Sequence, residues 1–356
     1  MRAIVKARPL SRALRSPDAE LHVHGETDVR AAGCSIVTVH YNPDDGLVYC
    51  GLTTGTNDLL WTYDPRTQQY ASLGYGQVAE KYEVKIHRSL VQDEGFIYGA
   101  TACLHTDLER LEAPGGKLFR YDPRTRQYEV LAVPVPHEYI QTIAIDHKRK
   151  VIYGHTYPLR LLWSFDLKTR KVTDLGIASV PDGLFCDRDG NVWGTVGRQA
   201  QLFKYNPDDG FTVFDFPLPK FMGRPDRMAD CLHAADDSVI YIGCGSGAIF
   251  SLDPKSMKFR YLGHPLPASR IHGLILGRDG LIYGAGGSKG NAENGLFAYD
   301  RESEKFHDLG LIYDPAEDCY NRVAHCLTMT DDGTIINGET DHPERSGYLW
   351  ESTIEK

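Results

Sequence analysis

Apolar and polar residues alternate in short runs along this chain, and the runs recur in a fixed order. The segment RIHGLILGRDGLIYGAGG, from Arg270, holds a polar residue, an apolar run, a charged turn and a second apolar run that ends in glycines. The segments KIHRSLVQDEGFIYGATA, from Lys85, and RVAHCLTMTDDGTIINGET, from Arg322, repeat that order. Apolar runs of this length between turn residues predict β-strands. Self-similarity at a regular spacing predicts a repeat architecture.

One polar position opens each copy of the pattern. Counting back eleven residues from the Tyr, Trp or Ile at the position of Tyr283 gives seven polar anchors: Thr38, His87, Thr142, Asp182, Asp230, His272 and His325. After its two apolar runs, each of the first six copies continues into a third strand and a turn, as in LFRYDPRTRQYEVLA from Leu118. Pro, Asp and Thr favour such turns, and a fourth strand follows. Four short strands in about 40–50 residues are typical of a propeller blade.

The sequence therefore predicts a single all-β domain over residues 1–356, a seven-bladed β-propeller of four-stranded antiparallel blades. The last repeat holds only three strands before the chain ends at Lys356. An unpaired sheet edge would remain there, so we expect an N-terminal strand to close the fold. RAIVKA, from Arg2, is favoured over AELHVHG, from Ala19. A sandwich of loosely similar hairpins is the alternative, and the repeated third-strand turn argues against it.

Composition and charge narrow the classes of function. The net charge of -9 argues against a general binder of nucleic acid or of acidic membranes. No apolar run reaches the roughly 20 residues that span a bilayer. The eight Cys form no CxxC pair and indicate reduced thiols. The N-terminal segment has no apolar stretch of a secretory signal, so we expect a cytoplasmic monomer, or a secreted one if this is a processed form.

Polar and basic residues are expected to gather at one edge of the blades. In an antiparallel hairpin, the start of one strand and the end of the next lie at the same edge. Residues beside the anchors should therefore meet residues that follow the second strands. Those of interest are His87, Arg88, His105, Tyr139, His155, Tyr157, Arg160, Arg198 and Arg227. On an acidic protein such an edge would concentrate a small anionic ligand. Polar lining of a water-filled channel is the plainer interpretation of any one histidine.

Histidine, tyrosine and arginine together suit β-elimination at a uronic acid. An imidazole ordinarily titrates near neutral pH, so His87 and His105 can share the work of base and acid. The phenol of Tyr157 can return a proton to a leaving oxygen. Arg160, or alternatively Arg198, can bind the uronate carboxylate through two parallel hydrogen bonds. Neutralising that carboxylate acidifies C5, so a base can remove the C5 proton while an acid assists departure at O4.

The segment KIHRSLVQDEGFIYGATACLH, followed by VIYGHTYPLRLLWSFDLKT, resembles the seven-bladed propeller polysaccharide lyases, which include ulvan lyases and rhamnosyl-glucuronate lyases. The resemblance implies a carbon–oxygen lyase that cleaves a rhamnose–glucuronate or ulvan-like glycan. It implies that His87, His105 and Tyr157 are catalytic, with Arg160 as the carboxylate-binding residue. We expect Arg88, Tyr139, Arg198 and Arg227 to bind the acidic oligosaccharide. The motifs that carry the resemblance cover residues 85–165.

A metal site is the second candidate. Asp230, His272 and His325 hold the anchor position in three consecutive repeats, and these side chains suit one structural divalent ion, zinc or calcium. The resemblance also implies a structural metal near this place. Ordinary polar lining of the channel is the alternative. No organic cofactor is expected, because the glycine-rich segments do not precede helices.

Two other functions remain open. One is a non-catalytic propeller that binds an acidic sugar or a protein partner through the same edge. The other is a calcium-dependent hydrolase of the lactonase kind. That chemistry needs carboxylates and amides around one hard cation, whereas the anchors are rich in histidine.

Overall fold

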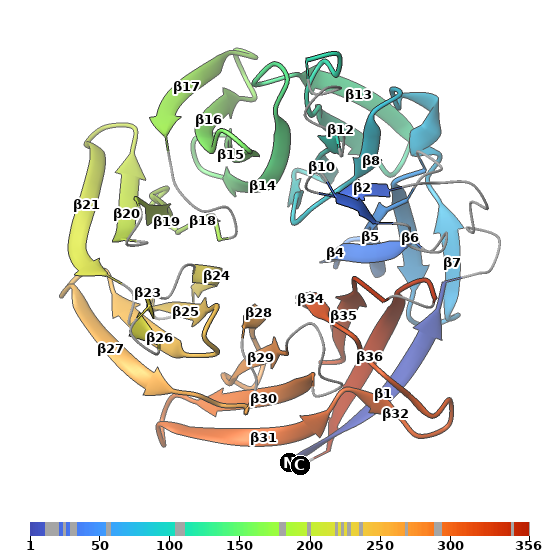
Figure 1. Cartoon of the computed structure of the whole chain (residues 1–356), viewed down its shortest axis with the longest axis vertical. Helices are drawn as coiled ribbons and strands as arrows, with labels where there is room; N and C mark the ends of the chain where they lie inside the picture. Colours follow the sequence, from blue (N-terminus) through green and yellow to red (C-terminus); the bar gives the residue numbers. More distant parts are fainter. Residues whose placement is uncertain are drawn as a thin grey trace. The chain divides into compact units, whose positions relative to one another are not determined.

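The structure is a computed structural model of the 356-residue chain. It describes residues 1–10, 21–23, 26–28, 34–54, 58–103, 111–177, 183–197, 201–217, 220–221, 224–225, 229–234, 238–267, 270–287, 294–342 and 345–355. The fold is an all-β, seven-bladed propeller of four-stranded antiparallel blades, as the repeat pattern predicts (Figure 1). Within the described residues the one helical segment is a short 3-10 turn, η2 (Tyr75–Gln77). That part of the chain has no helix long and apolar enough to cross a membrane.

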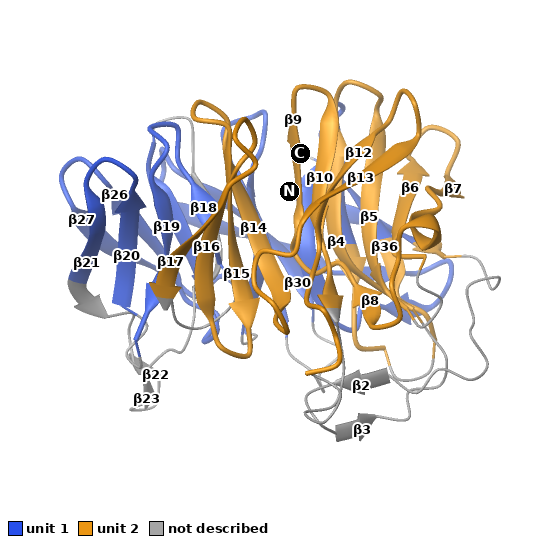
Figure 2. Ribbon diagram, turned by 90° about the horizontal axis from the view of Figure 1, so that it is seen from above, with its two compact units in different colours: residues 1–7, 178–337, 350–356 blue, residues 8–177, 338–349 orange. Residues whose placement is uncertain are grey.

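The chain divides into two compact units, shown in separate colours in Figure 2. Unit 2 comprises residues 8–177 and 338–349 and contains the first three blades. Its strands are β4 (Ser35–Asn42), β5 (Leu47–Thr53), β6 (Leu60–Asp64), β7 (Gln69–Ser72), β8 (Glu83–Lys85), β9 (Leu90–Asp93), β10 (Phe96–Ala100), β11 (Ala102–Cys103), β12 (Leu118–Asp122), β13 (Gln127–Ala132), β14 (Tyr139–Asp146), β15 (Val151–Tyr157), β16 (Leu161–Asp166) and β17 (Val172–Ile177). Blade one is β4 to β7, blade two is β9, β10, β12 and β13, and blade three is β14 to β17. The short strands β8 and β11 extend the sheet of blade one through β5.

Unit 1 comprises residues 1–7, 178–337 and 350–356. Its strands, some of which extend past these limits, are β1 (Arg2–Pro9), β18 (Phe185–Cys186), β19 (Val192–Val196), β20 (Gln201–Asn206), β21 (Gly210–Pro217), β22 (Lys220–Phe221), β23 (Arg224–Pro225), β24 (Ala229–Ala234), β25 (Ile240–Cys244), β26 (Ile249–Asp253), β27 (Lys258–Gly263), β28 (Ile271–Leu276), β29 (Ile282–Gly286), β30 (Gly295–Asp300), β31 (Lys305–Leu311), β32 (Tyr313–Asp314), β33 (Cys319–Tyr320), β34 (Ala324–Met329), β35 (Ile335–Glu339) and β36 (Tyr348–Glu355). Blades four, five and six are β18 to β21, β24 to β27 and β28 to β31.

The N-terminal strand completes the last blade, as predicted. The sheet order is β1-β36-β35-β34, so RAIVKA in β1 is the fourth strand. Ala3, Val5 and Ala7 are buried and alternate with exposed residues, which is the pattern of a strand with one face on the core. The alternative segment from Ala19 does not take this place, because its described part, β2 (Leu21–Val23), pairs with β3 (Glu26–Asp28).

A contact between a glycine and an aromatic ring is repeated in four blades. The glycine lies in the second strand and the ring lies directly opposite in the third. The pairs are Gly99 with Phe119, Gly154 with Trp163, Gly194 with Phe203 and Gly284 with Phe297. All four rings are buried. Because glycine has no Cβ, the aromatic ring of the third strand can pack directly against the second strand. The ring occupies the space that a side chain at the glycine position would fill.

We predict that Gly154→Ala destabilises the protein. A Cβ at Gly154 would lie 2.0 Å from Cζ2 of the fully buried Trp163, so the ring or the strand must move. Overpacking of this kind costs about 1–3 kcal/mol. Thermal or urea unfolding measures the loss. Gly76→Ala is the control, because its added Cβ meets nothing within 4 Å, and it should leave the unfolding midpoint unchanged. Equal stability of both variants would contradict the packing argument.

Candidate functional site

His87 lies at the entrance of blade two, and its tautomer is defined by the backbone. It lies between β8 and β9, so the strand begins at Leu90, slightly later than the anchor pattern predicts. The side chain is 5% exposed, and Nδ1 lies 2.8 Å from the carbonyl oxygen of Gln141. A carbonyl only accepts hydrogen bonds, so Nδ1 carries the proton and the basic lone pair of the neutral ring is on Nε2.

Two hydrogen bonds join the His87 segment to blade three. Besides the one to Gln141, the hydroxyl of Thr142 donates to the carbonyl oxygen of Arg88 at 3.1 Å. The ladder between β14 and β15 shifts register between Ile140 and Thr142, so Gln141 falls outside the regular pairing. Such irregularities re-aim backbone groups. Here the shift leaves the Gln141 carbonyl to face His87.

His155 lies in β15, directly opposite Thr142 of β14. It is 4% exposed, and neither ring nitrogen has a hydrogen-bond partner among the described residues. Burial, together with the smaller effect of the positive charge of Arg160, lowers the pKa of His155 to about 4. The ring is therefore neutral at physiological pH.

Two tyrosines face each other at the end of the same ladder. Tyr139 pairs with Tyr157, and their ring centroids are 5.0 Å apart with an angle of 35° between the planes. Tyr139 is buried and Tyr157 is half-buried. The phenol of Tyr157 thus stands at the strand end, backed by a second ring. Aromatic surfaces of this kind pack against apolar ligand faces while their hydroxyl groups bond polar ones.

The loop from Tyr157 to Arg160 is held at both ends. The amide of Leu159 donates to Oε2 of Glu138 at 2.8 Å, and the amide of Leu161 donates to the hydroxyl of Thr156 at 3.0 Å. Arg160 itself is exposed and has a left-handed backbone, with φ 61°. The backbone of this loop is therefore fixed at both ends, and the Arg160 side chain is exposed to solvent.

Two buried glutamates near this edge are not among the residues predicted from the sequence. Glu83 and Glu138 each lie four residues before an anchor and are each 1% exposed. Glu83 accepts a hydrogen bond from the Thr101 hydroxyl at 2.8 Å and lies 3.3 Å from the ammonium of Lys117. Glu138 holds the Tyr157–Arg160 loop. The signal that could have found them is the same residue type at the same distance from the anchor in two successive repeats.

The structure brings five of the predicted residues into blades two and three of unit 2. These are His87, Arg88, Tyr139, Tyr157 and Arg160. The second predicted histidine and two predicted arginines lie outside the described residues: His105, Arg198 and Arg227. Their roles remain predictions.

The predicted metal ligands belong to unit 1. His272 in β28 and His325 in β34 are both buried, with ring centroids 6.2 Å apart. Nε2 of His272 lies 3.2 Å from the carbonyl oxygen of Gly287, which makes Nε2 the protonated nitrogen and places the lone pair on Nδ1. Asp230 is in β24, but its side chain is not described. Over the side chains that are described, no three His, Cys, Asp or Glu converge on one point.

A family model and several solved structures match this chain. The model of the SMP-30/Gluconolactonase/LRE-like region matches residues 36–225, more than half of the 356 residues. No curated protein sequence matches significantly.

The solved structures show the same fold at low sequence identity. A streptogramin B lyase structure is 11% identical, has a TM-score of 0.69, and the match covers 99% of this chain and 98% of that chain. Virginiamycin B lyase from Staphylococcus aureus is 12% identical, with a TM-score of 0.66 over 99% of this chain and 100% of that chain. An extracellular domain of a hybrid two component system from B. thetaiotaomicron is 16% identical, with a TM-score of 0.62. That match covers 93% of this chain but spans only 39% of the larger chain.

We predict that His155 makes the protein less stable in mild acid. Its pKa is depressed from about 6.5 in the unfolded chain to about 4 in the fold. As the pH falls from 6.5 to 4, the unfolded chain binds a proton that the folded chain does not, so stability falls by up to about 1.4 kcal/mol per pH unit.

Urea unfolding at several pH values, with His155→Gln beside the parent protein, measures this contribution. The variant should lose part of the pH dependence in that window. The exposed His264→Gln is the control and should keep it. Identical curves for His155→Gln and the parent protein would contradict the assignment.

We predict that the protein holds a stoichiometric divalent metal when it is purified without chelator. The motivation is the adjacent pair His272 and His325, together with Asp230 at the same repeat position. Elemental analysis should find zinc or calcium, and His272→Ala with His325→Ala should remove it. If no metal is found in the parent protein, the histidines only line the interior.

Proposed function

The chain belongs to the SMP-30/gluconolactonase/LRE-like family, and from that premise we propose that it is an enzyme, a lyase that cleaves a glycosidic bond to a uronic acid by β-elimination. The substrate class is an oligosaccharide or polysaccharide of the rhamnose–glucuronate or ulvan type, as the resemblance of residues 85–165 implies. Two of the solved structures with this fold are lyases, which supports elimination on this scaffold.

The observation that carries the proposal is the hydrogen bond from His87 Nδ1 to the Gln141 carbonyl. A general base needs a defined lone pair and a pKa near the working pH. The carbonyl defines the lone pair as that of Nε2. The same hydrogen bond stabilises the imidazolium that forms once Nε2 has taken a proton, because the proton on Nδ1 stays bonded.

The loop from Tyr157 to Arg160, which belongs to the same blade as the Gln141 carbonyl, would supply the other two groups. Arg160 can bind the uronate carboxylate with a bidentate pair of hydrogen bonds, which stabilises the negative charge that develops when C5 loses its proton. Tyr157 can donate its phenolic proton to O4 as the C4–O4 bond breaks. The C5 proton passes to His87, the electron pair forms the C4–C5 double bond, and O4 leaves as a hydroxyl group.

Hydrolysis is less well supported by the same residues. A glycoside hydrolase commonly uses two carboxyl groups that flank the scissile glycosidic bond. The two carboxylates described beneath this edge, Glu83 and Glu138, are each 1% exposed and accept hydrogen bonds from the protein. They hold loops in place and are not presented to a substrate.

A binding module is the second candidate function. The paired rings of Tyr139 and Tyr157 would suit the face of a sugar ring, and Arg160 would bind its carboxylate. A sugar bound in this way need not react. One solved structure with this fold is an extracellular domain of a two component system, which supports a non-catalytic role as a second possibility for this fold.

We predict that the enzyme produces an unsaturated uronate. Ultraviolet absorbance of the C4–C5 double bond should rise with rhamnose–glucuronate or ulvan-type oligosaccharides, with galacturonate oligosaccharides as a comparison. His87→Gln and Tyr157→Phe should each lower turnover by about 10²–10⁴-fold. Arg160→Ala should lose turnover, and Arg160→Lys should restore little of it because the planar fork is absent.

Two matched variants control for general damage to unit 2. His147→Gln changes a histidine that pairs with Asp93 outside the site, and Arg66→Ala changes an arginine whose side chain is 77% exposed. Both should keep full turnover. Flat absorbance on every acidic sugar, with saturable binding of one of them, would establish the binding module instead.

A further inference from the structure

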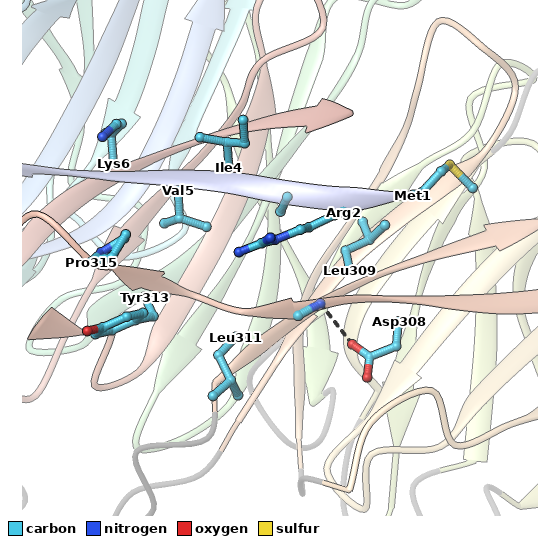
Figure 3. A pocket seen from close by; sticks show the side chains of 12 residues that line it. Met1, Arg2, Ile4, Val5, Lys6, Asp308, Leu309, Leu311, Tyr313 and Pro315 are labelled. Carbon is cyan, nitrogen blue, oxygen red and sulfur yellow. Dashed lines mark hydrogen bonds between the residues drawn. The ribbon is translucent and has the colours of Figure 1, made fainter. Parts of the chain in front are cut away.

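A second candidate site lies in unit 1, along the outer edge of β1. A groove of about 540 Å³ runs between β1 and the end of β31. Its lining comes from two stretches, 1–6 and 308–311, and from Tyr313 and Pro315. Figure 3 shows β1 and the Leu309–Leu311 segment side by side, with the Arg2 side chain reaching into the space between them. Neither the repeat pattern nor the proposed function accounts for this groove.

The groove exposes apolar surface. Met1 and Ile4 are each 42% exposed, and Leu311 is 46% exposed. Met1 directly precedes β1, Ile4 belongs to β1 and Leu311 ends β31, and all three line one groove. Contiguous exposed apolar surface of this kind marks an interaction site.

One wall of the groove is an open strand edge. β1 is the last strand of its sheet order, so no further strand of that sheet pairs with its outer side in the described residues. The amide of Ala7 donates to Oδ2 of Asp314 in β32 at 2.9 Å, which shows that the outer side of β1 faces the segment after β31. Backbone groups alternate in direction along a strand, so the amides of Ala3 and Val5 point to that same side.

Two cations of β1 stand beside this edge, and the exposed Asp308 also lines the groove. Arg2 and Lys6 are both exposed on β1. Among the described residues Arg2 makes no hydrogen bond and no ion pair, and its guanidinium reaches into the groove (Figure 3). An apolar groove with an open strand edge and a guanidinium suits an extended chain that carries both apolar and acidic side chains.

A second copy of this chain is a poor occupant. If β1 paired with β1 of another copy in an antiparallel register centred on Ile4, each Arg2 would lie opposite a Lys6. A register centred on Val5 would place Arg2 opposite Arg8. Like charges directly opposite each other destabilise a strand pair, and cations on an edge strand oppose self-association.

We propose that this groove binds an extended peptide segment of another protein, in which an apolar and an acidic residue stand two positions apart on one face as Ile4 and Arg2 do, by adding it as a strand to the outer edge of β1. The amides of Ala3 and Val5 pair with the peptide backbone. The apolar side chains of the peptide contact Ile4 and Leu311, and one acidic side chain pairs with Arg2.

Fluorescence anisotropy with a labelled, end-capped peptide that repeats the sequence Val-Thr-Glu-Thr, which places Val and Glu on one face of the strand, tests the proposal. The full chain should bind it saturably, and at least tenfold more tightly than the same peptide with Lys in place of Glu. Arg2→Glu and Leu311→Asp should each weaken binding at least tenfold, since both side chains are exposed and line the groove. Ala3→Pro removes one outward amide and should also weaken binding. Lys255→Glu makes the same kind of charge reversal on an exposed residue elsewhere in unit 1 and should have no effect.

Three results would overturn the proposal. They are no saturable binding of the Glu peptide, equal binding of the Glu and Lys peptides, and unchanged binding by Arg2→Glu and Leu311→Asp. A concentration-dependent dimer in sedimentation velocity, abolished by Leu311→Asp, would assign the groove to a second copy instead. Thermal unfolding of each variant confirms that it is folded. The readout is independent of uronate turnover, so it stands whether or not the lyase activity is found.

Discussion

The contact between a strand glycine and the aromatic ring opposite it is the constraint on which four of the blades depend. The ring of Trp163 lies so close to Gly154 that a Cβ added there would clash with it. This contact allows only one register between the second and third strands of blade three, because a shift by one residue would place a Cβ against the ring. The end of β15 follows from that register, and with it the positions of His155 and Tyr157. The chemistry at the edge of the blade is thus determined by packing in its interior.

Buried polar groups then connect neighbouring strands at that edge. Glu83 and Glu138 are carboxylates in an almost solvent-free position, and each would be costly to bury without partners. Backbone amides, a hydroxyl and the ammonium of Lys117 supply those partners. A buried carboxylate that loses its partners destabilises the fold by more than a hydrogen-bonded one stabilises it. These contacts therefore act mainly to exclude other loop conformations. The loop that carries Arg160 is restricted in the same way, because the amide of Leu159 donates to Glu138.

The repeat period explains why the architecture could be predicted from the sequence. Seven polar anchors in register gave the number of blades, and the truncated last repeat gave the closing strand RAIVKA. Hairpin geometry also predicted that Tyr139, at the start of one strand, lies beside Tyr157, at the end of the next, and these two residues pair in the structure. The register shift at Gln141 did not, because it arises from how two strands pair and leaves no mark in hydrophobic periodicity. The same holds for the short strands β8 and β11, where a pairing distant in sequence overrides the simple anchor pattern. The partners of the buried glutamates are likewise a property of tertiary structure.

The acceptor that orients His87 is a main-chain carbonyl, and this has an evolutionary consequence. Every amino acid carries the same carbonyl group, so a replacement of Gln141 leaves the acceptor in place as long as the local backbone is kept. Replacements of Gln141 therefore do not change which ring nitrogen of His87 carries the proton. A lineage that altered the basicity of His87 would have to change the strand register itself, which the buried aromatic contact of the same blade resists. The tautomer of His87 is thus protected from replacements at Gln141, while the side chains around the ring remain open to selection for new ligands.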